Sequence, residues 1–367
     1  MTELAVLGGG QLGWMLGLAA GRLGIATRFL DPSSEAPAGR VGPLTVAALD
    51  DHDAVLRFAA GADVVTYEWE GVPASTIEAL LAAGHQVDPG VTPLAVSQDR
   101  LVEKTRLETV GIPCAAHRAV DDAAGLAAAV AVIGLPAVLK TRRGGYDGKG
   151  QVVLRTEADL SPALEALAGA GPLILEALVP FDREVSVVAV RSHDGEVLAW
   201  PLVTNEHRDG ILRLSVAAGD DRTLEARAVE HVTRLADDLG HVGVITLELF
   251  VVGDALIANE FAPRVHNSGH WTIEGAATSQ FENHVRAVCG LPLGPTAPTA
   301  AAAMVNCIGR APDPAVVAGV EGAVLHDYGK APRRGRKVAH ITVTAPDRTA
   351  LGARIGTLRA MSPGDDG

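Results

Sequence analysis

The hydrophobic pattern of the first 95 residues alternates short apolar runs with a run of helical character. Apolar segments 4–7, 26–30 and 62–67 each end at a glycine or an acidic residue, and the helical run 11–23 separates the first two. This order of strand, helix and strand is typical of a parallel sheet, whose ligand groups lie at the carboxyl ends of the strands. We therefore predict a small α/β domain over residues 1–95.

The following 200 residues are expected to combine a small compact unit with a set of longer strands. Helices are predicted over residues 98–110, 121–133, 161–168 and 225–239, and strands over residues 137–140, 151–154, 173–176, 185–190, 197–204, 246–252 and 255–261. A proline-rich run, residues 292–298, predicts a linker into a final unit of about 70 residues. The pattern thus divides the chain into three parts.

The charge of the chain restricts its partners. It contains 31 Lys and Arg against 44 Asp and Glu, a formal charge of −13, with 48% apolar residues. This composition is that of a globular protein with a large core. The negative charge argues against a nucleic-acid-binding protein and against binding to anionic lipid. Any anionic ligand must therefore be bound by local cationic groups or by a metal.

Two long uncharged segments do not have the composition of membrane spans. Residues 4–21 contain six glycines and residues 287–309 contain three prolines, so we predict no transmembrane segment and no signal peptide. The three cysteines, Cys114, Cys289 and Cys307, are scattered without paired spacing. They fit a reducing compartment, and we expect a cytosolic protein without a disulfide framework.

A glycine turn follows the first predicted strand. Gly8, Gly10 and Gly13 form GxGxxG, and Asp31 ends the next strand, which formally matches a dinucleotide-binding fingerprint. Such a turn also presents backbone N–H groups and a helix N-terminus to a single phosphate, or serves close packing. The domain is short for both mononucleotide halves, which disfavours NAD, while a lone phosphate and packing stay open.

A second glycine-rich segment, KTRRGGYDGKG over residues 140–150, is more informative. Lys140 ends a strand, and a loop with four glycines and further cations leads to the next strand. Such a loop can fold over a polyphosphate, because glycine lets the backbone approach closely and adopt positive φ. The alternative is a hairpin loop whose cations are solvated.

Two glutamates occupy otherwise apolar strands. Glu248 and Glu260 lie on either side of a turn at Gly253-Asp254, which brings them within about one residue of being opposite each other. Carboxylates in such strands are costly unless they are paired or bind a cation, and oxygen ligands suit Mg²⁺ shared with phosphates. The alternative is that each glutamate faces solvent on its own strand.

A donor-rich loop follows directly. Arg264, His266, Asn267 and His270 stand within seven residues, a set suited to a small planar anion beside a metal. Zinc bound by the two histidines is a further alternative, which the absence of a nearby cysteine and the irregular loop disfavour. Five cations within residues 330–337 of this acidic chain form either a solvated face or, because glycines frame them, a phosphate contact.

In this order, the segments closely resemble the ATP-grasp superfamily, and within it the family of 5-(carboxyamino)imidazole ribonucleotide synthases of purine biosynthesis. The resemblance spans nearly the whole chain and is carried by GGGQLGWM at 8–15, YEWEGVP at 67–73, KTRRGGYDGKG at 140–150, NEHRDGILRLSVA at 205–217, NEFAPRVHNSGHWT at 259–272 and GRKVAH at 335–340. The fifth of these is the most specific.

The resemblance implies an ATP-grasp architecture of mixed α/β and α+β class. It comprises an N-terminal parallel-sheet domain over residues 1–95, a central ATP-grasp domain over 96–292 with a lid subdomain at about 114–178, and a small β-rich C-terminal domain over 293–367. The implied ligase uses MgATP to convert bicarbonate to carboxyphosphate, which carboxylates the exocyclic amine of 5-aminoimidazole ribonucleotide and releases ADP and phosphate. A cytoplasmic homodimer without nucleic-acid or membrane partners is also implied.

The resemblance also assigns site residues. Those implied for ATP are Arg100, Lys140, the loop residues Gly144, Gly145, Tyr146, Asp147, Gly148, Lys149 and Gly150, the adenine-side residues Glu176, Ala177, Leu178 and Val179, and Glu184, His207, Asn259 and Glu260. Glu248 and Glu260 would bind Mg²⁺; Arg264, His266 and Asn267 would hold bicarbonate and carboxyphosphate, with Asp147 as a further catalytic residue. The acceptor would be bound at its phosphate by Gln11, Leu12, Lys330 and Arg336, and around its aminoimidazole by Glu70, Tyr146 and Asp147.

One position departs from the wider superfamily. Many members place Asn two residues after the second metal glutamate, and here that position is Ala262. This leaves the third metal ligand open.

Three other functions remain as alternatives. A formate-dependent glycinamide ribonucleotide transformylase would share the phosphate and metal parts, but the loop at 264–272 disfavours it. A dinucleotide-dependent oxidoreductase would need a second half-sheet and would not need two hairpin glutamates. A non-catalytic nucleotide sensor is disfavoured by the intact Lys140, Glu248 and Glu260.

Overall fold

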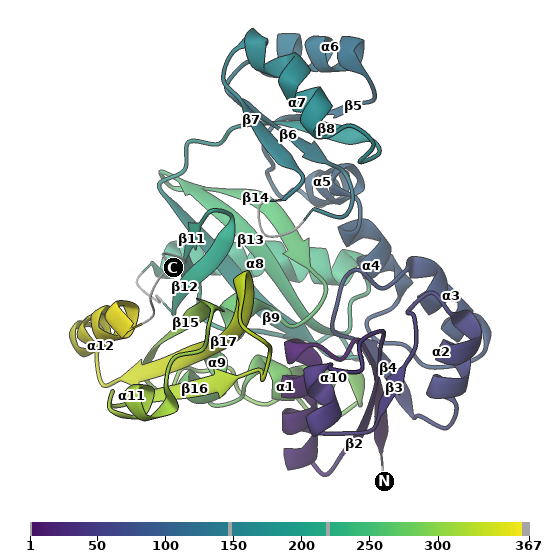
Figure 1. The fold of residues 1–367 in the computed structure, drawn as a ribbon, viewed down its shortest axis with the longest axis vertical. Helices are drawn as coiled ribbons and strands as arrows, with labels where there is room; N and C mark the ends of the chain where they lie inside the picture. The colour runs from purple at the N-terminus through teal and green to yellow at the C-terminus, as the bar shows by residue number, and fades with distance from the viewer. Residues whose placement is uncertain (1, 146–148, 218–220, 362–367) are drawn as a thin grey trace.

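Three β-sheets organise the chain in the computed structural model, which describes residues 2–145, 149–217 and 221–361. A four-stranded sheet lies at the N-terminal end, a nine-stranded sheet runs through the middle, and a second four-stranded sheet stands apart at the top of Figure 1. The fold has the mixed class that the resemblance implies.

The N-terminal sheet is parallel, with the strand order β3-β2-β1-β4. Its strands are β1 (Glu3–Leu7), β2 (Ala26–Asp31), β3 (Leu44–Val46) and β4 (Val64–Tyr67), and its helices are α1 (Gln11–Arg22), η1 (Pro37–Arg40), α2 (His52–Ala59), α3 (Ala74–Ala82) and α4 (Val91–Ser97). Both faces are covered: Leu4 and Val6 pack in one core with α1, and Ala5 and Leu7 in another with α2 and α3. The predicted α/β arrangement is confirmed.

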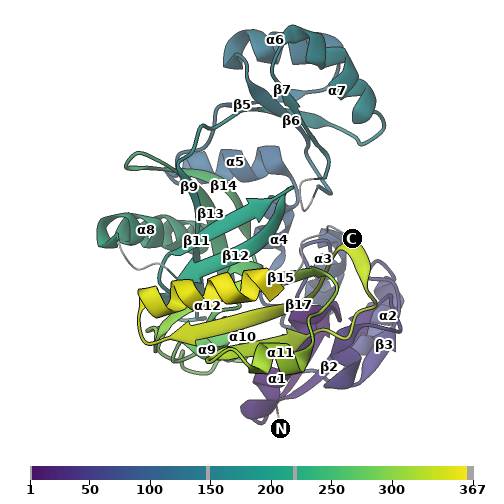
Figure 2. The same cartoon turned by 60° about the vertical axis from the view of Figure 1, so that its left-hand side comes forward.

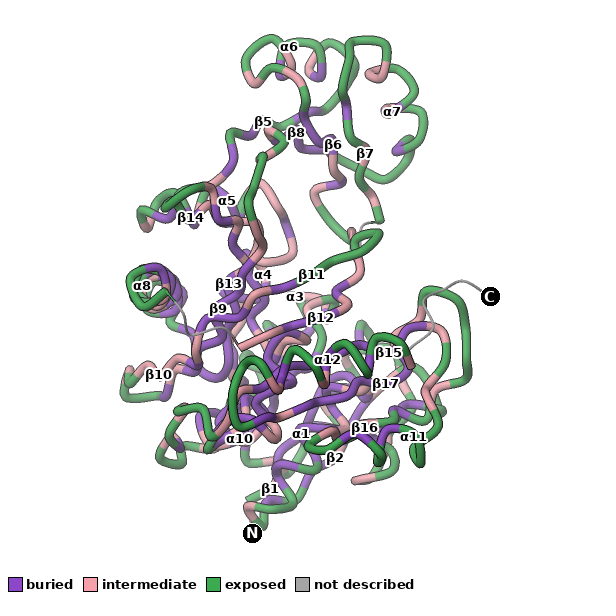
Figure 3. Tube along the Cα trace, turned by 90° about the vertical axis from the view of Figure 1, so that its left-hand side faces the viewer, coloured by how far each residue is buried: buried purple, intermediate pink, exposed green. Residues whose placement is uncertain are grey.

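The sheet that stands apart is antiparallel, with the order β5-β8-β6-β7. Its strands are β5 (His117–Val120), β6 (Ala137–Thr141), β7 (Gln151–Leu154) and β8 (Leu173–Ala177), with α6 (Ala123–Ile133), η2 (Glu157–Asp159) and α7 (Leu160–Ala166) on one face. It has a core of its own, centred on Leu126, Leu139 and Leu175. Figure 2 shows this unit above α5 (Arg100–Thr109), and Figure 3 shows that α6 and α7 are mostly exposed.

The central sheet has the strand order β14-β13-β9-β11-β12-β15-β17-β16, and β10 pairs with β9. Its strands are β9 (Arg183–Arg191), β10 (Val197–Ala199), β11 (Val203–Arg208), β12 (Ile211–Ala217), β13 (Gly243–Val252), β14 (Ala255–Ala262), β15 (Ala301–Gly309), β16 (Ala323–Asp327) and β17 (Arg333–Ala345). The remaining helices are α8 (Arg222–Asp238), η3 (Asn267–Gly269), α9 (Thr272–Gly275), α10 (Gln280–Val288), α11 (Pro314–Ala318) and α12 (Arg348–Met361). One sheet thus connects the strand that carries Glu260 with the last strands of the chain.

One predicted strand is wrong. The expected strand at 197–204 is two strands, β10 and β11, which both pair with β9. Between them, Trp200 is buried and its indole N–H donates to the Thr278 carbonyl at 2.9 Å, while Pro201 has no N–H to contribute to a ladder. The buried anchor and the missing donor interrupt the strand.

No helix within the described residues is both long enough and apolar enough to cross a bilayer. The longest of them, α8, begins three residues before its predicted start because Asp221 caps it, accepting a hydrogen bond from the Leu224 N–H.

Candidate active site

The hairpin of β13 and β14 carries the two predicted metal ligands. Glu248 and Glu260 are direct cross-strand neighbours, and the turn at Gly253-Asp254 joins the two strands as expected. Arg100 Nη1 lies 2.7 Å from Glu260 Oε2, and His266 Nε2 lies 2.9 Å from Glu248 Oε1. Each carboxylate is therefore matched by a nitrogen donor.

The protonation state of Glu248 suits a cation site. Burial raises its pKa, but the interactions with His266, His207 and Arg264 together outweigh burial and hold the pKa of the Glu248 carboxyl at about 2. Two carboxylates on adjacent strands form an oxygen donor set that fits Mg²⁺. Within the described residues, no group of three or more His, Cys, Asp or Glu side chains could hold a metal by itself, so phosphate or water oxygens would have to complete this site.

The nucleotide end of the site contains cations that already have acidic partners. Lys140 Nζ lies 2.9 Å from Glu176 Oε2, and Lys104 Nζ lies 3.3 Å from the same oxygen. Burial lowers the pKa of Lys140, and Glu176 offsets this only in part. The other carboxylate oxygen of Glu176 is buried and has no hydrogen-bond partner in the described part of the chain. Lys104 also donates to the carbonyl of Asn259, a predicted site residue, at 3.1 Å. Lys104 itself was not predicted and belongs to this group of side chains.

Helix α5 contributes a further buried acid. Glu103 accepts a hydrogen bond from the Phe261 N–H at 2.6 Å, directly beside Glu260. Burial and then the charge of Glu260 raise the pKa of Glu103 to about 8. Glu260, at 2.7 Å, is therefore the acid that pairs directly with Arg100.

The glycine-rich loop lies over this end. Gly145 accepts a hydrogen bond from Arg100 Nη2 at 3.1 Å, and the Gly150 carbonyl accepts one from the Thr141 N–H at 2.8 Å. Gly144 and Lys149 are also described, whereas Tyr146, Asp147 and Gly148 lie outside the described residues.

Two arginines of this loop have a structural partner. Arg142 Nη2 and Arg143 Nε lie 2.8 Å and 3.3 Å from the same Asp99 oxygen, and Asp99 caps the first turn of α5. These cations hold the base of the loop on α5.

The adenine-side residues lie at the end of β8 and just beyond it. Glu176 and Ala177 belong to the strand, Leu178 is 37% exposed, and Val179 follows it. Glu184 on β9 contacts the ring of His207 on β11. Burial lowers the pKa of His207, but the Glu184 contact and the other nearby glutamates outweigh burial, so the pKa is raised.

The donor-rich loop contacts the hairpin of β13 and β14 through His266 and Glu248. Arg264 Nε contacts the Glu70 carboxylate, and although burial raises the pKa of Glu70, Arg264 outweighs burial and holds it at about 2. Both amide atoms of Asn267 are buried without a hydrogen-bond partner among the described residues. His270 does not join them: it is buried against Phe281 and His340.

Gln280 holds the backbone of this loop and was not predicted. Its Oε1 accepts from the His266 N–H at 2.9 Å, and its Nε2 donates to the His266 carbonyl at 2.6 Å. The side chain is fully buried at the start of α10. A glutamine 14 residues beyond its partner carries no local signal of this role.

The acceptor end lies where the N-terminal and C-terminal parts meet. Lys330 Nζ contacts Gln11 Oε1 and stands 5.6 Å from the centre of the Tyr328 ring. Burial and the neighbouring Arg336 lower the pKa of Lys330 to about 8. Arg336 donates to the Ala331 carbonyl at 3.4 Å.

Some backbone N–H groups around the glycine turn before α1 are bonded to carboxylates, and others have no acceptor within the helix. The Gly9 N–H donates to Asp31 at 2.8 Å, and the Gly10 N–H donates to the buried Glu68 at 2.9 Å. Gln11 and Leu12 are the first two residues of α1, which has no side-chain cap, so their N–H groups have no acceptor within the helix. They lie beside Lys330 through the Gln11 contact.

These contacts disfavour the dinucleotide hypothesis. Asp31 uses both oxygens on backbone N–H groups, those of Gly9 and Ser33. A Cβ on Gly8 or Gly10 would come within 2.8 Å of Glu68, so the glycines serve close packing around this carboxyl. Glu68 was not among the predicted site residues. Burial raises its pKa to about 7, although the Gly10 N–H offsets part of the effect.

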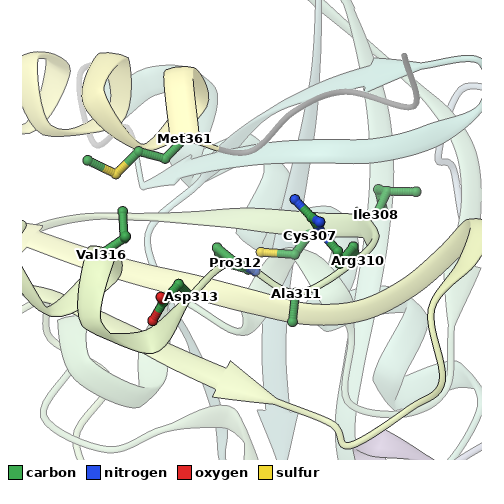
Figure 4. Close-up of a pocket in the computed structure, with 8 residues that line it drawn as sticks. All are labelled: Cys307, Ile308, Arg310, Ala311, Pro312, Asp313, Val316 and Met361. Carbon is green, nitrogen blue, oxygen red and sulfur yellow. The ribbon is translucent and has the colours of Figure 1, made fainter. Parts of the chain in front are cut away.

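A pocket of about 120 Å³ lies elsewhere, between β15, α11 and α12 (Figure 4). It is lined by Cys307, Ile308, Arg310, Ala311, Pro312, Asp313, Val316 and Met361. None of these is a predicted site residue, and the pocket has no acid pair for a metal.

Comparison with known proteins divides the chain into three matching domains. Residues 1–98 match the ribonucleotide synthetase preATP-grasp domain, residues 105–281 the ATP-grasp domain, and residues 302–354 the phosphoribosylaminoimidazole carboxylase C-terminal domain. The N5-carboxyaminoimidazole ribonucleotide synthase of Pseudomonas aeruginosa is 50% identical over 98% of this chain and 99% of its own. The chain belongs to the N5-carboxyaminoimidazole ribonucleotide synthase family.

Further members of the N5-carboxyaminoimidazole ribonucleotide synthase family share the whole fold. The crystal structure of the Thermus thermophilus synthetase is 51% identical, covers 98% of both chains and has a TM-score of 0.93. That of the Aspergillus clavatus synthase, in complex with ADP and 5-aminoimidazole ribonucleotide, is 32% identical, with 98% and 99% coverage and a TM-score of 0.90.

Proposed function

We propose that this chain is an ATP-dependent ligase that carboxylates the exocyclic amine of 5-aminoimidazole ribonucleotide in purine biosynthesis. The products are N5-carboxyaminoimidazole ribonucleotide, ADP and phosphate. The observation that carries the proposal is the arrangement of Arg264, His266 and Asn267 beside the paired Glu248 and Glu260, in a chain that belongs to this family.

Bicarbonate is the proposed carboxyl source. One of its oxygens attacks the γ-phosphorus of ATP, the bond from that phosphorus to the oxygen that bridges to ADP breaks, and ADP leaves as carboxyphosphate forms. Arg264, His266 and Asn267 would bind this anion, and the unpartnered buried amide of Asn267 is the strongest support, because such groups are costly without a ligand. The buried loop would also keep the unstable intermediate from water.

The second step transfers the carboxyl group. The acceptor amine attacks the carbonyl carbon of carboxyphosphate, and the bond between carbon and the phosphate oxygen breaks. The amine proton must leave, and Asp147 is the proposed base. Glu70, Tyr146 and Asp147 would surround the aminoimidazole, and the Glu70 contact with Arg264 supports the adjacency of the two substrates.

Glu248 and Glu260 are the proposed Mg²⁺ ligands. When bound, Mg²⁺ would neutralise charge that develops on the transferring phosphoryl group. Arg100 and Lys140 would hold the ATP phosphates under the loop of residues 144–150. Glu176, Ala177, Leu178 and Val179 would contact the adenine, and Glu184, His207 and Asn259 would complete the nucleotide site.

The acceptor phosphate would bind between α1 and the segment before β17. The open N–H groups of Gln11 and Leu12 support this, since a helix N-terminus favours an anion. Lys330 and Arg336 would supply the positive charge.

The proposal includes the organisation of the molecule. The N-terminal domain would cover residues 1–95, the ATP-grasp domain 96–292 with its lid at about 114–178, and the C-terminal domain 293–367. A cytoplasmic homodimer is proposed from the family resemblance, and cysteines that form no disulfide within the described residues agree with a reducing compartment.

An ADP-release assay with single omissions tests the proposal. Release should require ATP, bicarbonate and 5-aminoimidazole ribonucleotide together for full rate, and formate should not replace bicarbonate. Formate-dependent turnover would favour the transformylase, and ATP binding without ADP release would favour a sensor.

A further inference from the structure

A row of buried polar side chains leads across the central sheet to His266. We call Ser215, Asn205, Ser186 and Ser268 the serine–asparagine chain. They come from β12, β11, β9 and η3, and at most 6% of any of them is exposed. The neighbouring strand positions Val185, Val187 and Leu214 are buried and apolar, so four polar groups here need a reason.

The serine–asparagine chain is linked without a gap by hydrogen bonds. Ser215 Oγ lies 2.8 Å from Asn205 Oδ1, Asn205 Nδ2 3.0 Å from Ser186 Oγ, and Ser186 Oγ 2.7 Å from Ser268 Oγ. Ser268 Oγ then lies 2.8 Å from His266 Nδ1. The other ring nitrogen, Nε2, faces Glu248 at 2.9 Å.

One contact sets the direction of every hydrogen bond in the chain. The backbone N–H of Ser268 points at His266 Nδ1 at 3.3 Å, and a backbone N–H can only donate. Nδ1 must therefore accept, and the Ser268 hydroxyl donates to it as well. Ser268 then accepts from Ser186, Ser186 accepts from the Asn205 amide, and the Asn205 carbonyl oxygen accepts from Ser215.

We infer that the serine–asparagine chain positions His266, holding Nδ1 as an acceptor so that Nε2–H is the donor of the ring; Nε2–H faces Glu248 here and would turn to the reacting anion when that anion binds beside Glu248. Gln280 fixes the backbone of His266, whereas this chain fixes the orientation of its ring and the nitrogen that carries the proton. His266 would thus serve bicarbonate and carboxyphosphate as a hydrogen-bond donor. The inference rests on the proposed role of His266 in that reaction.

The nitrogen that carries the proton can be measured without turnover. Two-dimensional ¹H–¹⁵N spectra of the full chain labelled with ¹⁵N-histidine, recorded at pH 8 without ligands, distinguish the two tautomers. The His266 signals are assigned by their loss in His266→Gln. We expect the wild type to carry the proton on Nε2, and a proton on Nδ1, in the neutral or the charged ring, overturns the inference.

Substitutions in the serine–asparagine chain distinguish a role in positioning His266 from a role in folding. Ser268→Ala removes the hydroxyl at 2.8 Å and leaves Nδ1 only the longer hydrogen bond from the backbone N–H at 3.3 Å. It should therefore weaken the preference for the Nε2–H tautomer and lower kcat on the order of 10–100-fold, with the KM for ATP within about twofold. Ser186→Ala, one link further away, should do the same to a smaller degree. Thr76→Val is the control. It removes a fully buried hydroxyl of α3 that donates to the Leu49 carbonyl, and it should change neither the tautomer nor kcat.

Two results of the variants would also overturn the inference: Ser268→Ala with wild-type signals and kcat, or equal tautomer changes in Thr76→Val. If Ser268→Ala does not fold in a thermal unfolding assay, the wild-type spectrum and Ser186→Ala still decide. If the wild type shows no bicarbonate-dependent ADP release, the proposed function fails while the spectrum still tests the assignment of the proton.

Discussion

The proposed nucleotide end and the proposed acceptor end of the site hold their cations in different ways. At the nucleotide end, Lys140 and Arg100 are each within 2.9 Å of a carboxylate oxygen, those of Glu176 and Glu260. A phosphate that binds there must take these cations from an acidic partner. The binding free energy gained from each new phosphate contact is therefore reduced by the loss of an existing ion pair.

At the acceptor end, the cations have neutral partners. Lys330 contacts the amide of Gln11 and the ring of Tyr328, and Arg336 contacts a backbone carbonyl; among the residues that the structure describes, neither forms an ion pair. The lowered pKa of Lys330 reflects burial and the repulsion by Arg336. A phosphate that arrives here relieves this repulsion, so we expect acceptor binding to depend directly on these side chains.

The largest effect should come from the carboxylates of the nucleotide end. We expect Glu260→Gln, and likewise Glu248→Gln, to lower turnover by at least ~100-fold, because the charge neutralisation that a metal supplies is worth several kcal/mol. The amide keeps the shape of the side chain, so thermal unfolding should change little. ADP release and thermal unfolding measure the two expectations.

The matched control is Glu206→Gln, which removes an exposed glutamate on β11 that contacts Arg359. It should turn over like the wild type. If Glu260→Gln keeps wild-type turnover as well, Glu260 is not a metal ligand.

The acceptor end is tested by Lys330→Ala. A hydrogen bond to a charged group contributes about 1.5–3 kcal/mol, so the KM for 5-aminoimidazole ribonucleotide should rise roughly 10–150-fold. The KM for ATP should change little, which steady-state kinetics with each substrate varied will show. Arg333→Ala removes an exposed cation of the same basic segment and should leave both constants near wild type. A rise in the ATP KM alone would place Lys330 in the nucleotide site.

The pH dependence of acceptor binding should also identify Lys330. Its pKa of about 8 means that it is charged below pH 8 and neutral above, and only the charged form attracts phosphate. The acceptor KM should therefore be flat from pH 7 to 7.5 and rise several-fold by pH 9. Lys330→Arg should remove the rise, since guanidinium stays charged. An equal rise in Lys330→Arg would assign it to another group.

The smallest effect should appear in amide hydrogen exchange. Exchange at Gly144, Gly145 and Gly150 should slow roughly tenfold with MgATP, because bound phosphates would hold the loop. Gly9 and Gly10, whose N–H groups are already bonded to carboxylates, provide the internal comparison and should not change. Equal protection of the loop with and without MgATP would exclude a nucleotide clamp.

The parts of the site that local geometry determines were predictable. A two-residue turn pairs Val252 with Ala255 and predicts that Glu248 and Glu260 lie within about one residue of being opposite. The structure confirms this, and a register shift between Glu248 and Leu249, which the sequence did not reveal, makes the two glutamates direct neighbours. The parallel order of β1, β2 and β4 followed from apolar runs at regular spacing.

The partners of these residues were not predictable. Lys104 and Glu103 look like ordinary charges of an amphipathic helix, and only the packing of α5 under β8 and β14 buries them against Glu176 and Glu260. Ser186 likewise has no distinctive local pattern, because its partners come from strands whose order the chain does not reveal locally. In both cases the whole fold, and not the local sequence, determines which side chains meet.

The pairing of β12 with β15 has a consequence for how the molecule is made. Leu214 lies opposite Val305, so a strand of the central domain depends on a partner about 90 residues later in the chain. During synthesis from the N-terminus, the metal carboxylates and the loop at 264–267 emerge first, while β12 still presents a bare edge that can pair with other chains. Lys330 and Arg336, which would supply the positive charge for the acceptor phosphate, emerge last. A nascent chain therefore reaches closure of its sheet and completion of its acceptor site in the same final stage of its synthesis.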